Sequence, residues 1–223
     1  RAAPFDPMSD CPYETALLTH WAAGPDSAAD SAHDLAHIRR VWANCQHIAK
    51  GENAPVDLDL LHAAAIFHDL VNLPKDAPNR AEASRLSAEA AAPLARACGF
   101  PEAKIPALKH AITAHSFSAN MHPKTLEAKI LQDADRLDAL GAIGLARMLM
   151  VSGALARPLY DSTDPLAQNR DPDDTAFVLD HFQTKLFTLA DTMQTVTARQ
   201  IAEERTQYMR SFLTRLQSEI PES

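Results

Sequence analysis

His68 and Asp69 stand side by side directly after the apolar run 63–67. An ionised carboxylate that is buried without a partner is costly, so proteins protonate it, pair it or bind a cation with it. A neutral imidazole and an ionised carboxylate are both ligands for Zn, Mn, Fe or Ni. A divalent ion with open positions lowers the pKa of bound water and withdraws charge from phosphoryl oxygens. The pair therefore indicates half of a metal site suited to hydrolysis.

The other half of the site must come from neighbouring segments. His37 lies on a polar stripe beside the apolar arc of one predicted helix, and Asp133 and Asp135 lie on a long buried segment at 124–150. By helical periodicity Asp133 falls in the arc of Leu126, Ile130 and Leu137, whereas Asp135 falls in a second arc with Leu131 and Ala142. Periodicity alone does not choose between the two aspartates.

The elements that must position these groups are helices. Apolar residues recur at helical spacing along most of the chain, and no run of alternating β-branched residues stands out. The second helix has a candidate cap at Asp30 or Ser31, and the segment 124–150 has a candidate break near Gly141 or Gly144. We expect one all-α domain over 1–223, with the core motifs at about 25–150, a long loop at about 157–173, and helices at about 10–23, 30–50, 57–69, 79–98, 101–118, 124–150, 173–189 and 191–218.

The net charge of the chain limits the kinds of molecule that it is expected to bind. The formal net charge is -8 and the pI is about 5.6, so we expect no broad basic surface for duplex nucleic acid or anionic lipid. A small anionic substrate would need local cations or a metal. Three cysteines are scattered singly, and no apolar stretch of about eighteen residues or signal-peptide pattern is present. We therefore expect a cytoplasmic protein without a membrane span.

Three ordered motifs carry a family resemblance. The stretches "HDLAHIRRV", "FHDL" and "QDADRLDALGAIGLAR" resemble the motifs of the HD-domain metal-dependent phosphohydrolases. "HSFS" and "DHFQTKL" extend the resemblance to the small bacterial HD proteins, over about residues 25–200. It implies an all-helical bundle with a central metal site, and its ligand pattern maps onto His37, His68, Asp69 and Asp135.

The resemblance also implies roles for nearby residues. It favours Asp135 as the ligand and leaves Asp133 as a partner that orients a histidine. His33 is expected to support the site from one turn before His37. Asp69 would ligate and also hydrogen-bond the attacking water, with His68 beside it in the catalytic centre. The phosphate charge must be met by further groups, and the candidates are Lys75, Arg80, His110, His115 and Lys185.

The expected activity is hydrolysis of a phosphoester or phosphoanhydride bond in a small nucleotide. Removal of pyrophosphate from a (deoxy)nucleoside triphosphate and dephosphorylation of a nucleotide are both compatible with the motifs. The metal is expected to be Mn, Mg, Co, Ni, Zn or Fe, with Mn favoured by the family. A homodimer is one option for the subunit count, which the sequence leaves open.

Two other classes of function stay open. Some HD-like proteins hold two irons and oxidise their substrate, for which His110, His115 and His33 are the obvious additional ligands. The chain could also be a non-catalytic nucleotide-binding module that keeps a metal for stability. Hydrolysis of stringent-response alarmones is disfavoured, because the Glu-Asp pair that activates water in those enzymes is replaced here by Asn72 and Leu73.

Overall fold

Helices form the regular secondary structure in the part of the chain that the structure describes, and no β-strand occurs there. The structure is a computed structural model that describes residues 11–23, 34–71, 73, 79–116, 119 and 121–221. The all-α prediction is confirmed. The chain divides into two compact units, 1–49 with 53–132 and 50–52 with 133–223, and each is described by itself. The prediction of a single domain stays a prediction.

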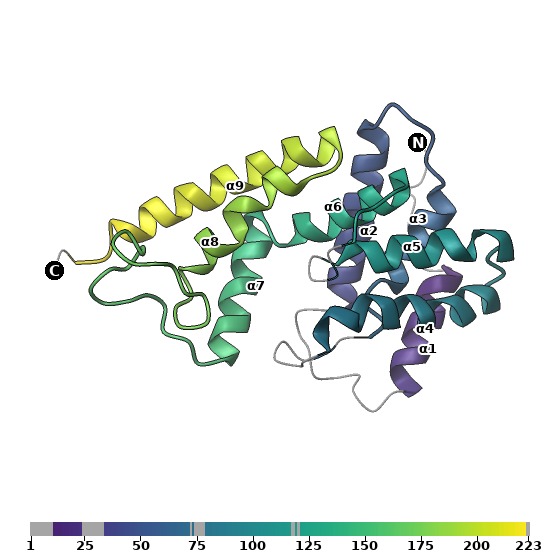
Figure 1. Ribbon diagram of the computed structural model, residues 1–223, viewed down its shortest axis with the longest axis horizontal. Helices are drawn as coiled ribbons and strands as arrows, with labels where there is room; N and C mark the ends of the chain where they lie inside the picture. The colour runs from purple at the N-terminus through teal and green to yellow at the C-terminus, as the bar shows by residue number, and fades with distance from the viewer. Residues whose placement is uncertain are drawn as a thin grey trace, which may run out of the picture. The chain divides into compact units, whose positions relative to one another are not determined.

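The first unit is a bundle around the apolar helix α3, Leu58–Phe67 (Figure 1). Residues 63–67 of α3 have no exposed surface, and the helix packs against α1, α4 and α5. A helix that is apolar all round is stable only when other elements cover it. The surrounding elements are α1 (Pro12–Ala23), α2 (Leu35–Gly51), α4 (Ala83–Ala97), α5 (Ile105–His115), the first half of α6 (Leu126–Asp138) and the 3-10 helices η1 (Arg80–Glu82) and η2 (Glu102–Lys104).

Two aspartates fix where the helices that lead to the candidate site begin. The N–H of Leu60 donates to Asp57 Oδ1 (3.1 Å) at the start of α3, and the N–H of His37 donates to Asp34 Oδ1 (2.8 Å) at the start of α2. Each carboxylate satisfies a backbone donor of the first turn, which is what an N-cap does. The cap predicted at Asp30 or Ser31 lies outside the described residues, and the described helix is capped by Asp34 instead.

The second unit contains the end of α6, α7 (Gly141–Ala154), α8 (His181–Thr184) and α9 (Val196–Gln217), with the 3-10 helices η3 (Leu186–Thr188) and η4 (Ala190–Thr192). Helix α7 packs against α9 (Figure 1). The break predicted near Gly141 is confirmed: Gly141 has φ +73°, a left-handed conformation that glycine adopts without steric penalty. A Cβ on Gly144 would lie 2.1 Å from the carbonyl oxygen of Ala139, so this close approach also requires glycine.

The helix predicted over 173–189 is wrong, because the structure shows only the short α8 followed by η3. Asp173 Oδ1 accepts hydrogen bonds from the N–H (2.9 Å) and Oγ1 (2.6 Å) of Thr175. Asp180 Oδ2 accepts from the N–H of Asp173 (2.6 Å). Aspartate side chains that bond nearby backbone groups offer the chain an alternative to a helix. Apolar periodicity does not detect this competition.

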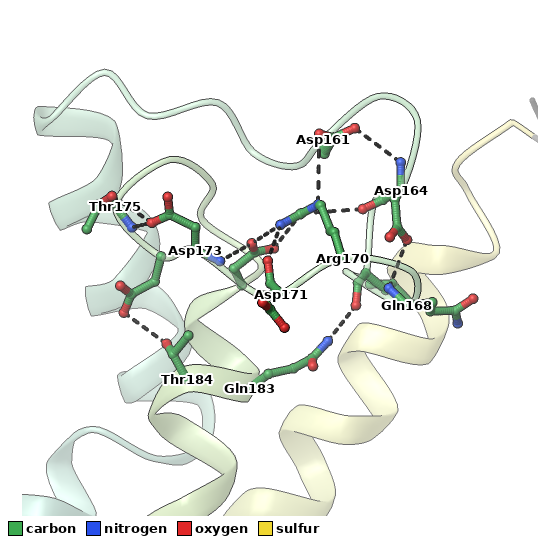
Figure 2. A network of polar contacts seen from close by, with 12 residues as sticks. Asp161, Asp164, Gln168, Arg170, Asp171, Asp173, Thr175, Gln183 and Thr184 are labelled. Atoms are coloured by element: carbon green, nitrogen blue, oxygen red, sulfur yellow. Dashed lines mark hydrogen bonds and ion pairs between the residues drawn. The ribbon is translucent and has the colours of Figure 1, made fainter.

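The long loop predicted at about 157–173 is present and is held by carboxylates, as Figure 2 shows. Arg170 lies at the centre of the network and binds the buried Asp180 through both terminal nitrogens (2.5 and 2.9 Å). Asp164 accepts from the N–H groups of Gln168 (2.9 Å) and Asn169 (2.7 Å). The loop therefore has its own internal polar framework.

Among the described helices, none is by itself long and apolar enough to cross a membrane, although α6 and α7 together meet the criterion of length and composition as a bent pair.

Candidate metal centre

Three helix termini of the first unit bring together the histidines and the aspartate that the motifs single out. His37 is in the first turn of α2, His68 and Asp69 directly follow α3, and His115 is the last residue of α5. His37 and His68 have no exposed surface, and His115 is 5% exposed. Polar groups buried this completely require partners.

The side chains converge on Asp69, and its two carboxylate oxygens face different histidines. Asp69 Oδ2 lies 3.6 Å from His37 Nε2 and 3.5 Å from His68 Nε2. Asp69 Oδ1 lies 3.5 Å from His115 Nε2. The Nε2 atoms of His37 and His68 are 3.3 Å apart, and ligand atoms of His68, Asp69 and His115 lie within 4.8 Å of one another.

Hydrogen bonds to backbone carbonyls determine which ring nitrogen carries the proton. His68 Nδ1 donates to the carbonyl oxygen of Ala65 (2.8 Å), and His115 Nδ1 donates to that of Ile112 (2.5 Å). A carbonyl only accepts, so both protons are assigned to Nδ1, and in the neutral rings both Nε2 atoms present lone pairs toward Asp69. This is the usual arrangement of histidines that bind metals.

The electrostatics of the cluster also fit a cation. Burial acts to raise the pKa of Asp69, but when the rings are protonated, the charge of His68 and the hydrogen bonds from His115 and His37 outweigh burial and hold the pKa well below its usual range. When the rings are neutral, the same carboxylate faces imidazole lone pairs, and such a set of acceptors is stabilised by a shared cation. The donor set of nitrogen and oxygen atoms suits a divalent transition metal.

The segment after Asp69 is fixed by a serine that the sequence interpretation did not single out. Ser87 Oγ accepts from the N–H of Val71 (3.0 Å) and donates to its carbonyl oxygen (3.4 Å). Ser87 is 1% exposed on the face of α4 that packs inward. Its position among the buried alanines of that face was the available signal, because a polar residue on an apolar face must find a partner.

Asp133 accepts hydrogen bonds from the segment at the start of α9. Its oxygens accept from the N–H groups of Gln194 (2.9 and 3.1 Å) and Thr195 (2.8 Å) and from Thr195 Oγ1 (2.8 Å). These bonds hold the start of α9, and none of them goes to a histidine. That Asp133 orients a histidine stays a prediction, while the described contacts hold it to the α9 cap.

The other predicted residues are placed as follows. Asp135 is half-buried on α6 and belongs to the second unit, as does Lys185 at the end of α8, so their roles stay predictions. His110 Nε2 accepts from the N–H of Lys124 (2.9 Å), which ties α5 to the segment before α6. The predicted contact of His110 with the substrate also stays a prediction. Lys75, His33 and the side chain of Arg80 lie outside the described residues.

Comparison with known proteins finds a matching domain family and a similar protein. A model of the HD domain matches residues 34–140. The protein YpgQ of Bacillus subtilis is 33% identical over 205 residues, which cover 90% of this chain and 91% of that protein.

Solved structures extend the likeness to the fold. The crystal structure of YpgQ in complex with ADP has a TM-score of 0.69 at 32% identity, over 95% of this chain and 98% of that chain. A protein of Bacillus thuringiensis described as an HD-superfamily hydrolase has a TM-score of 0.68 at 30% identity, over 93% of this chain and 95% of that chain. With relatives at this identity and coverage, and with the histidines and aspartate of the motif gathered at one point, the chain belongs to the HD-domain family.

Proposed function

We propose that this protein is a divalent-metal-dependent phosphohydrolase that acts on a small nucleotide. The observation that carries the proposal is the convergence of buried histidines on Asp69, with the Nε2 atoms of His68 and His115 each 3.5 Å from its carboxylate. The reaction is either removal of pyrophosphate from a (deoxy)nucleoside triphosphate or dephosphorylation of a nucleotide. The complex of YpgQ with ADP supports a nucleotide as the substrate class.

The metal ligands in this proposal are His37, His68, Asp69 and Asp135, and Mn²⁺ is the favoured ion. A bound divalent ion lowers the pKa of a coordinated water and withdraws charge from the phosphoryl oxygens. The carbonyl oxygen of Ala65 orients the ring of His68 (2.8 Å), so that its Nε2 lone pair is fixed before a ligand arrives. A preorganised ligand loses little side-chain freedom on binding.

Asp69 has two separate tasks in this proposal. Its Oδ2 faces His37 and His68 and belongs to the ligand set, whereas its Oδ1 faces His115. Oδ1 can therefore accept a hydrogen bond from the attacking water while Oδ2 stays with the ligands. The carbonyl of Ile112 orients the ring of His115, so that its Nε2 can accept a hydrogen bond from the water or, when the ring is protonated, donate one to a phosphate oxygen.

The phosphate charge requires further cations, because the chain as a whole carries a formal net charge of -8. We propose that Lys75, Arg80 and Lys185 meet that charge and that His110 adds a hydrogen bond. In this proposal these residues supply positive charge at the site, on a chain whose net charge is negative. Such a balance favours a small anionic substrate over duplex nucleic acid.

A nucleotide screen tests the proposal. Ribo- and deoxyribonucleoside mono-, di- and triphosphates are incubated with the protein and Mn²⁺, and the products are resolved into pyrophosphate and orthophosphate. We expect turnover of at least one nucleotide and its loss in His68→Ala. The matched control is His47→Ala, which removes an exposed histidine from α2 and should leave the rate unchanged. Absence of turnover with every nucleotide and with Mn²⁺, Mg²⁺ and Co²⁺ would contradict the proposal.

A further inference from the structure

Gln132 of α6 carries a buried oxygen that the described protein does not satisfy. The side chain is 3% exposed, and its Nε2 donates to the carbonyl oxygen of Ala114 (2.7 Å). Because a carbonyl oxygen only accepts, the amide nitrogen must be the atom on that side. Oε1 is therefore turned away from Ala114, and among the described residues no group donates a hydrogen bond to it.

A buried amide oxygen without a donor is unfavourable, and most such atoms in folded proteins have a protein or water partner. Gln132 is also anchored by its own Nε2, so its Oε1 is held in one direction. A fixed, desolvated acceptor is what a site for a hydrogen-bond donor requires. The partner must come from outside the described protein.

The position of Gln132 relates this oxygen to the candidate metal centre. Its anchor, Ala114, directly precedes His115, and His115 Nε2 lies 3.5 Å from Asp69 Oδ1. All of these residues belong to the first unit. Gln132 also lies three residues before Asp135, so the two side chains share a face of α6. The acceptor is therefore anchored to the residue next to His115, whose imidazole faces the oxygen of Asp69 to which the proposed function assigns the attacking water.

We propose that Gln132 Oε1 accepts a hydrogen bond from this water and orients it for attack on phosphorus. The inference rests on the proposed function. One O–H of the water donates to Gln132 and the other to Asp69. As the bond from the water oxygen to phosphorus forms, the bond from phosphorus to the leaving oxygen breaks. An amide is not basic, so the proton passes to the Asp69 carboxylate and from there to the leaving oxygen.

Two substitutions of Gln132 distinguish a role in orienting the water from a role in stabilising the fold. Gln132→Met keeps the length of the side chain and removes both the acceptor and the bond to Ala114. Gln132→Glu, when its carboxyl is ionised, removes the same bond to Ala114 but keeps an acceptor oxygen. Both variants are compared with the wild type by circular dichroism and Mn²⁺ titration before kinetics are measured on the nucleotide found by the screen.

We expect kcat of Gln132→Met to fall roughly a hundredfold, the size of effect that misplacement of a reacting group causes, with little change in KM. Gln132→Glu should keep more of the activity than Gln132→Met, with a new dependence on the ionisation of its own carboxyl in the pH profile. Equal loss in both variants at every pH would show that only the bond to Ala114 matters and would overturn the proposal. An unchanged kcat in Gln132→Met would overturn it as well.

Besides water, the 2′-hydroxyl of a ribonucleotide is an O–H donor that could reach Oε1. Comparison of ribo- and deoxyribonucleotides tests this source: a water partner predicts the same fold-loss for both, whereas a loss confined to ribonucleotides would assign Oε1 to the 2′-hydroxyl and overturn the proposal.

A structural measurement decides the question without activity. In a high-resolution crystal structure of the wild type with Mn²⁺, we expect a water at about 2.6–3.2 Å from Gln132 Oε1 and in contact with Asp69. A protein donor on Oε1, or a water isolated from Asp69, would overturn the inference. If the wild type hydrolyses no nucleotide, the proposed function fails, but this structure still tests the placement of the water.

Discussion

Replacement of Asp133 by alanine should destabilise the second unit strongly, because it removes the acceptors at the start of α9. The N–H groups of Gln194 and Thr195 and the hydroxyl of Thr195 all donate to this carboxylate. A buried donor left without a partner costs about 1–3 kcal/mol, and the part-buried N–H of Gln194 lies at the low end of that range. Thr195 also caps α9 by accepting from the N–H of Ala198 (3.3 Å), and a disturbed cap adds about 1 kcal/mol. With the two amides and the cap together, we expect a loss of about 4 kcal/mol.

The assay is urea unfolding at pH 7, followed by circular dichroism, with midpoints compared at constant slope. Asp133→Asn keeps one acceptor oxygen and should lose about half as much as Asp133→Ala. Asp191→Ala removes an exposed carboxylate from η4 and should change stability by less than about 0.5 kcal/mol. If Asp133→Ala destabilises no more than this control, the interpretation of Asp133 as the anchor of α9 is refuted.

Three further outcomes follow from the described contacts. Ser87→Ala should lower the unfolding free energy by about 1–2 kcal/mol, because the part-buried N–H of Val71 loses its acceptor; a urea midpoint equal to the wild type would contradict this. Hydrogen bonds from the N–H groups of Asn169 and Gln168 lower the pKa of Asp164, so the loop is stabilised above the ordinary carboxyl pKa and loses that contribution as the pH falls through the lowered value. Exchange of these two amides, corrected for intrinsic rates, should therefore rise in acid, and constant protection from pH 6 to about pH 3 would sink the idea. Burial and the charge of Lys124 lower the pKa of His110, so its imidazole should titrate below the ordinary value of 6.5 in an NMR titration, and a midpoint above that value would exclude the hydrogen bond from the Lys124 amide.

The sequence predicted the helical elements well where apolar periodicity was decisive. The buried helix that ends at His68 and the break at Gly141 were both expected, because a continuous apolar run and a glycine leave few alternatives. The segment 173–189 was misjudged, because its aspartates bond to nearby backbone groups. Those hydrogen bonds depend on how the loop folds in three dimensions, and the spacing of apolar residues does not indicate them.

The candidate site was predictable in part, because buried polar residues next to apolar runs stand out in the sequence. A histidine and an aspartate after an apolar run must be paired, His37 could be nominated by its place on a polar stripe beside an apolar arc, and His115 by the family resemblance. The partners of Asp133 could not be predicted, since Gln194 and Thr195 lie about sixty residues later in the chain. Gln132 was missed because a single glutamine in a helix is ordinarily a surface residue.

The central claim is that His37, His68 and Asp69 share a divalent cation. The most direct test is a crystal structure of the wild type with Mn²⁺, with anomalous diffraction used to locate the ion, and with His68→Ala crystals measured in parallel. We predict an anomalous peak bonded to His37 Nε2, His68 Nε2 and Asp69, which is lost in the variant. Wild-type crystals without a peak among these side chains, with each ring bonded to a separate neighbour, would contradict the account.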